Sequence, residues 1–130
     1  MKRTWITFTD HFEPGPMTPW VHRAVDAPIW VDAKVHEPPL PEPVPGEGYA
    51  RYHIEIDGVT FEFVSKVEIQ RCVEVLSERH LPSTLALCRG TGMGPNRHWL
   101  SRLPSRAKSW RYRERAVKEL RRFLQSLDQG

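Results

Sequence analysis

Residues 51–64 read RYHIEIDGVTFEFV, and their pattern determines the architecture that we expect for the whole chain. Apolar and polar residues alternate on both sides of Asp57-Gly58, a dipeptide that favours the tight type I′ turn of a β-hairpin. A two-residue turn at this point sets the register, so that both strands place their apolar side chains on one face. The expected cross-strand pairs are Ile56 with Val59, Ile54 with Phe61, and Tyr52 with Phe63.

A helix is expected directly after the hairpin. Ser65 and Glu68 have the spacing of a capping box, in which each side chain binds the backbone N–H of the other residue. Apolar residues then recur at helical spacing and predict a helix over about 66–79 with one buried stripe, while Glu68 is expected mostly away from that stripe. The stripe consists of Ile69, Cys72, Val73 and Leu76.

A second amphipathic pattern predicts a helix over about 110–127, capped by Ser109 or, one turn earlier, by Ser105. Stretches rich in aromatic and β-branched residues predict strands at 4–9 and 29–35, and residues 81–88 favour a further strand over an irregular extended segment. The sequence therefore predicts an α+β fold. In this fold, a small antiparallel sheet is formed by the hairpin 51–64 and the N-terminal strands, and the two main helices pack on one face.

Length and composition are those of a single globular domain over residues 1–130, with 39% hydrophobic and 27% charged residues. Eight prolines lie between Pro14 and Pro43, and we expect 37–48 to form an extended, proline-rich linker within that domain. A ligand for an SH3-like or WW-like groove is the alternative interpretation of this segment. Apolar runs fall far short of the roughly 20 residues of a membrane span. These features predict a cytoplasmic protein with no membrane partner.

Charge is distributed unevenly along the chain. Residues 89–130 contain eleven Lys and Arg against three acidic residues, whereas residues 1–88 contain eight against thirteen. Such asymmetry favours a polyanionic or acidic partner for the C-terminal third. Four cations, Arg111, Arg115, Lys118 and Arg122, recur at helical spacing. Glu114 is placed to pair with Lys118 and to offset part of this charge.

The leading functional hypothesis is a non-enzymatic protein that binds DNA or RNA through the basic C-terminal helix and the Gly/Arg loop before it. Arginine binds phosphates in a bidentate fashion, and aromatic rings can stack on unpaired bases. The candidate contacts are Arg89, Arg97, Trp99, Arg102, Arg106, Lys108, Arg111, Tyr112, Arg115, Lys118 and Arg122. Two alternatives stay open: an ordinary solvated helix face, and an interaction module (an inhibitor, immunity or accessory factor) that docks an acidic protein.

Catalytic, metal and cofactor sites are not predicted. The six histidines show no HxH or HxxxH spacing and are expected to be scattered and partly exposed, and Cys72 and Cys88 form no CxxC pair. The loop with Gly90, Gly92 and Gly94 lacks the lysine and spacing of a phosphate-binding loop. A Cys88–His98 nucleophile pair is the weakest of the alternatives.

Overall fold

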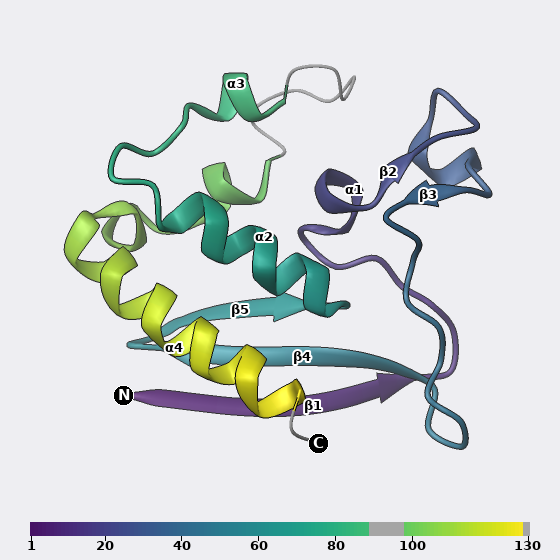
Figure 1. Ribbon diagram of the computed structural model, residues 1–130, viewed down its shortest axis with the longest axis horizontal. Helices are drawn as coiled ribbons and strands as arrows, with labels where there is room; N and C mark the ends of the chain where they lie inside the picture. The colour runs from purple at the N-terminus through teal and green to yellow at the C-terminus, as the bar shows by residue number, and fades with distance from the viewer. Residues whose placement is uncertain (89–97, 129–130) are drawn as a thin grey trace.

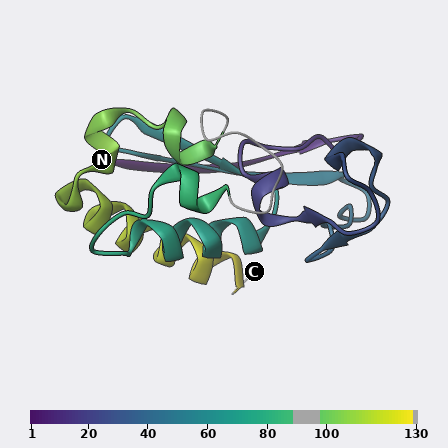
Figure 2. The ribbon, with the colours of Figure 1, turned by 90° about the horizontal axis from the view of Figure 1, so that it is seen from above.

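The hairpin and the first strand form an antiparallel sheet in the order β1-β4-β5 (Figure 1). The computed structural model describes residues 1–88 and 98–128. Its main strands are β1 (Lys2–Thr9), β4 (Tyr49–Ile56) and β5 (Val59–Phe63). Helices α2 (Lys66–Leu76) and α4 (Trp110–Asp128) lie on the same side of this sheet (Figure 2). The predicted α+β fold is confirmed.

The hairpin has the register that its turn predicts. Ile56 pairs with Val59, and the next two apolar pairs follow in step. Asp57 and Gly58 have φ values of 49° and 86°, as a type I′ turn requires at both central positions. Ile54, Ile56 and Phe63 are fully buried beneath the helices. The strand predicted at 4–9 is also present, as β1, and it pairs along the whole length of β4.

The remaining elements are short. A two-stranded ladder joins β2 (Arg23–Ala24) to β3 (His36–Glu37), after α1 (Thr18–Val21) and around the 3-10 turn η1 (Trp30–Asp32). Helix α3 (Thr84–Leu87) and the 3-10 turns η3 (Trp99–Arg102) and η4 (Ser105–Lys108) connect α2 to α4.

Two predicted strands are wrong. At 29–35, the Asp26 carboxylate accepts hydrogen bonds from the backbone N–H groups of Lys34 and Val35, which closes a loop in place of a strand. At 81–88, the Ser83 hydroxyl accepts the N–H of Ala86 and caps α3. In both segments a short polar side chain binds nearby backbone, and this local bonding outweighs β propensity.

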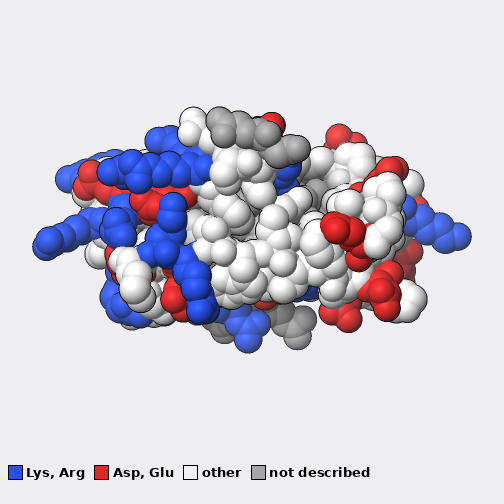
Figure 3. Space-filling model, turned by 90° about the horizontal axis from the view of Figure 1, so that it is seen from below, with Lys and Arg blue, Asp and Glu red and all other residues white. Residues whose placement is uncertain are grey.

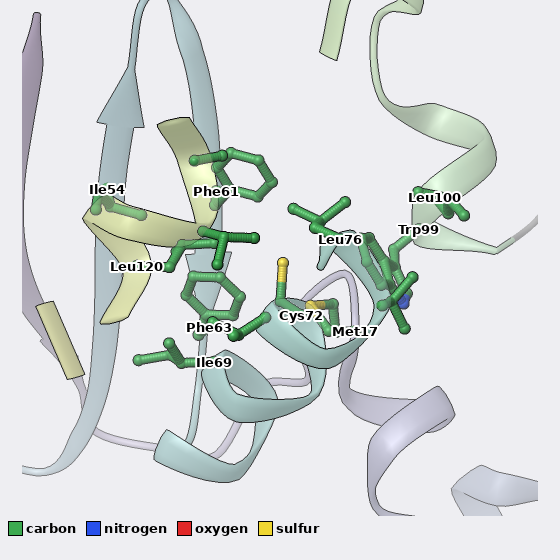
Figure 4. Close-up of a cluster of buried hydrophobic side chains, with 14 of the residues drawn as sticks. Met17, Ile54, Phe61, Phe63, Ile69, Cys72, Leu76, Trp99, Leu100 and Leu120 are labelled. Carbon is green, nitrogen blue, oxygen red and sulfur yellow. The ribbon is translucent and has the colours of Figure 1, made fainter. Parts of the chain in front are cut away.

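The core lies between the sheet and the two helices. Ile69, Cys72 and Leu76 of α2 meet Leu120 of α4 over the apolar face of the hairpin (Figure 4). Met17 and Trp99 extend this cluster and hold the segments before α1 and after α3 against it. Burying each large apolar side chain contributes about 1.5–3 kcal/mol, so this layer is the main source of stability.

Helix α2 ends at Leu76, three residues earlier than predicted, and the side chain of Arg113 from α4 binds the end of it. The buried Arg113 guanidinium donates to the carbonyl oxygens of Leu76 at 3.2 Å and Arg79 at 3.3 Å, and also to that of Glu78. The last carbonyls of a helix have no partner within the helix. Arg113 supplies that partner and joins the two helices.

Replacing Arg113 should therefore destabilise the protein. Arg113→Met keeps most of the aliphatic bulk but leaves the carbonyl of the buried Leu76 without this donor. We expect the free energy of unfolding to fall by about 2–3 kcal/mol. Arg121→Met, on the exposed side of the same helix, is the matched control and should change it by less than about 0.5 kcal/mol. Urea unfolding followed by circular dichroism measures both. Equal effects of the two substitutions would contradict the capping role of Arg113.

Candidate nucleic-acid interface and a buried polar cluster

The predicted cation stripe of α4 is exposed. Arg111, Arg115, Lys118 and Arg122, which we call the basic ridge, all lie on the solvent side of the helix. The opposite side carries Ala116, Leu120 and Phe123 into the core. Helix α4 therefore separates its apolar and cationic residues onto two faces, as its sequence spacing requires.

The hairpin turn anchors the ridge. The Asp57 carboxylate accepts a hydrogen bond from Arg115, and its backbone carbonyl accepts one from Arg106 at 2.9 Å. Asp57 also binds the N-terminal ammonium group. This ammonium group and, next, Arg115 hold the pKa of Asp57 below its ordinary value, so the carboxylate stays ionised.

Carboxylates neutralise only part of the ridge. Asp57 is shared between Arg115 and the N-terminal ammonium group, and the buried Glu119 is shared between Lys2 at 3.0 Å and Arg122 at 3.1 Å. Within residues 1–88 and 98–128, no carboxylate lies within ion-pair distance of Arg111 or Lys118, and the expected Glu114–Lys118 pair is not formed. Each paired carboxylate faces two cations, which leaves an excess of positive charge.

The surface shows the same imbalance. Figure 3 shows Lys and Arg gathered mainly toward one end of the molecule, with a few carboxylates among them, and mostly Asp and Glu at the other end. Figure 1 places the hairpin turn, η4 and the first turns of α4 at the basic end, and β2 and β3 at the other end. Arg106 and Lys108 of η4 belong to the basic end and adjoin the ridge.

The predicted stacking rings are not available to a base. Trp99 is buried in the core, and the half-buried Tyr112 donates its hydroxyl to the carbonyl of Ile56 at 2.9 Å. Trp110 is half-buried, with the guanidinium groups of Arg79 and Arg113 over its ring. Trp110 and Tyr112 lie in the first turn of α4, beside its apolar stripe, whereas Trp99 begins η3. The contacts left at the basic end are cationic.

One further described candidate, Arg102, is not part of the ridge. Arg102, at the end of η3, is exposed and lines a pocket of about 360 Å³ beside β5, together with Thr60 and Leu103. Arg89 and Arg97, with the glycine loop between them, lie outside the described residues.

A buried cluster of polar side chains was not foreseen. Thr18, His22, Ser65 and Glu68 are each less than 10% exposed and lie where α1 meets the start of α2. The His22 Nε2 lies 2.8 Å from the Ser65 hydroxyl and 3.6 Å from the Glu68 carboxylate, and the Thr18 hydroxyl donates to Glu68 at 2.9 Å. The expectation that Glu68 lies mostly away from the buried stripe is wrong.

Half of the predicted capping box is present. Ser65 accepts the N–H of Glu68 at 3.2 Å, as expected, but the Glu68 carboxylate accepts the N–H of Val64 instead of that of Ser65. The capping pattern was the one sequence signal at this site. Thr18 and His22 are more than 40 residues away in the chain, and no spacing rule connects them to Glu68.

Burial raises the pKa of Glu68 to about 7, although hydrogen bonds from the Val64 N–H and the Thr18 hydroxyl lower it in part. His98 is affected in the opposite way, because burial lowers its pKa to about 4 and keeps the ring neutral. Its Nδ1 accepts the N–H of Leu100 at 3.1 Å and caps η3.

The histidines and cysteines were the other candidate reactive side chains. His22, His36 and His98 are buried, so the expectation of scattered, partly exposed histidines is wrong for these three. The described residues contain no group of three or more His, Cys, Asp or Glu side chains that could hold a metal ion. Cys72 and Cys88 are both buried, and burial raises the pKa of the Cys72 thiol.

Comparisons with protein-family models, with curated proteins and with solved structures find no match to this chain. In the described part of the chain, no helix combines the length and the apolar character needed to span a bilayer.

Stability should depend on pH through Glu68. Its folded-state pKa of about 7 lies above the ordinary value of 4.5, so the folded state favours the protonated carboxyl. The protonated Glu68 therefore adds to the free energy of unfolding below pH 4.5, and this stabilisation is lost as the pH rises through 7. The total change is about 3 kcal/mol at most. Glu68→Gln should flatten the dependence between pH 5 and 8, as measured by urea unfolding. Parallel curves for the two proteins would contradict this assignment.

Proposed function

We propose that this protein binds nucleic acid through the basic ridge of α4 and the cations that adjoin it. The observation that carries the proposal is the arrangement of charge on one exposed helix face. Four cations point to solvent there, and the only carboxylates that pair with them within the described residues, Asp57 and Glu119, are each shared with a second cation.

The dimensions of the ridge suit a phosphate backbone. Residues 111–122 extend over about 16 Å at the helical rise of about 1.5 Å per residue. Over that length, duplex DNA carries roughly nine phosphate charges. Arginine side chains at such a surface bind phosphate oxygens in a bidentate fashion, and each contact releases condensed counterions.

The proposed mode of binding is independent of sequence. Phosphate contacts position a protein on nucleic acid but do not distinguish bases. Because Trp99 is buried and the Tyr112 hydroxyl is bonded to the sheet, we do not assign base stacking to either ring. The proposal therefore differs from the sequence-based hypothesis in its contacts. Arg106, Lys108 and the ridge remain candidate phosphate contacts, whereas Trp99 and Tyr112 are no longer candidate stacking residues.

Removing the two cations without a carboxylate partner should weaken binding. We expect Arg111→Ala/Lys118→Ala to lower the affinity for a 20-base-pair duplex roughly tenfold in 50 mM salt and to reduce the salt slope by about two. Arg23→Ala/Lys34→Ala removes the same charge near β2 and β3, at the opposite end, and should have little effect. Fluorescence anisotropy across a salt series measures both variants against the unmodified protein.

Two outcomes would count against the proposal. If the unmodified protein does not bind duplex or single-stranded oligonucleotides at low salt, the basic end is not a nucleic-acid surface. If both double variants lose affinity equally, binding reflects net charge and not the ridge. Capture of one acidic protein without affinity for nucleic acid would favour the interaction-module hypothesis instead.

A further inference from the structure

The buried polar cluster contains a serine and a histidine in a defined hydrogen-bonded order. The His22 Nδ1 lies 2.8 Å from the backbone carbonyl of Pro38, and its Nε2 lies 2.8 Å from the Ser65 hydroxyl. A carbonyl only accepts, so in the neutral ring the Nδ1 carries the proton and the Nε2 is an acceptor. The Ser65 hydroxyl must then donate to the Nε2, which is the order of a nucleophile and its general base.

We propose that Ser65 and His22 form a catalytic pair that hydrolyses short-chain carboxylic esters. This activity is separate from the proposed nucleic-acid binding and uses the other half of the molecule. Neither serine nor histidine stands in a sequence motif for such chemistry, and the fold brings them together from positions 43 residues apart.

The backbone around the pair explains its geometry. The ladder of β2 and β3 pairs Arg23 with Glu37, so the residues that follow and precede these positions, Pro38 and His22, lie side by side. The Pro38 carbonyl orients the imidazole, as a third group does in nucleophile–base–orienter arrangements. The proline-rich segment therefore folds back on α2 and supplies part of the site, beyond its predicted role as a linker.

A pocket opens beside the pair. It has a volume of about 300 Å³ and is lined by His22 and Ser65 together with Val44, Ala50, Tyr52 and Val64. The rest of the lining consists of Pro39, Pro41, Glu42, Lys66 and Val67. Walls of this apolar character suit a short acyl chain, and the small volume disfavours a long one.

Ser65 is also the N-cap of the eleven-residue helix α2. Its oxygen accepts the Glu68 N–H at 3.2 Å, and the N–H groups of Lys66 and Val67 have no acceptor within the helix. Donors placed here can stabilise the negative oxygen of a tetrahedral intermediate.

The reaction balances with water as the only co-reactant. The Ser65 oxygen forms a bond to the ester carbonyl carbon while the His22 Nε2 takes the hydroxyl proton. The carbon–oxygen bond to the alcohol then breaks, and His22 returns the proton to the departing oxygen. Water attacks the acyl-serine with His22 again as the base, and the free acid leaves as Ser65 regains its proton.

The direct test is labelling of the unmodified protein with a fluorophosphonate probe, followed by peptide mass mapping. We expect one adduct, on Ser65, together with hydrolysis of p-nitrophenyl butyrate. Ser65→Asn keeps a helix N-cap but has no nucleophile, and it should abolish both signals. His22→Gln should slow labelling at least about 100-fold.

Two controls separate this chemistry from folding and from nucleic-acid binding. Ser83 is the N-cap of α3 in the same manner as Ser65 but is exposed, and Ser83→Ala should leave labelling unchanged. Arg111→Ala/Lys118→Ala should hydrolyse the ester at the normal rate. The two proposals are therefore tested independently of each other. Absence of an adduct on Ser65 in the folded, unmodified protein overturns the catalytic pair, and equal labelling rates in His22→Gln overturn the role of the base.

Discussion

Burial of one face of the hairpin beneath α2 and α4 is the constraint on which the rest of the structure depends. Ile54, Ile56 and Phe63 lose all contact with solvent there, and they do so because the Asp57-Gly58 turn sets a register that places every apolar residue of both strands on the same side. A shift of one residue would move the whole set to the other face. Both helices must then present their apolar stripes to this layer, which fixes the orientation of α4 about its own axis. The cations on the opposite face of α4 therefore point to solvent.

The same turn also organises the charge of the basic end. Asp57 stands in a position that hairpin geometry requires, yet its carboxylate and its carbonyl each bind an arginine from the C-terminal third of the chain. A single aspartate at a turn thus links the hairpin to η4 and α4. Because Asp57 and Glu119 each serve two cations, they order the guanidinium groups without neutralising the surface. Ordered arginines bind phosphate at a lower entropic cost than mobile ones.

Sequence reasoning succeeded where the deciding interactions are local. The hairpin register, the Ser65 cap, the start of α2 and the two-faced character of α4 are all encoded within a few residues of where they act. It failed where distant segments decide. Trp99 is buried in the core, the Tyr112 hydroxyl is bonded to the sheet, and Glu68 is buried by Thr18 and His22 from another part of the chain. The strand expected at 29–35 fails for a different, local reason, because the Asp26 carboxylate binds the backbone of that segment. Periodicity places a residue on a face of its own element, but it cannot say what covers that face.

The buried polar cluster is difficult to explain by stability alone. Hydroxyl, imidazole and carboxyl groups removed from water must recover their hydrogen bonds inside the protein, and apolar residues of similar volume usually stabilise such a junction at least as well. Each of these groups nevertheless has a partner, down to the Pro38 carbonyl that determines which nitrogen of His22 carries the proton. In the neutral His22 ring, these partners set the order in which the Ser65 hydroxyl donates to the Nε2. Proton transfer from Ser65 to His22 requires that order.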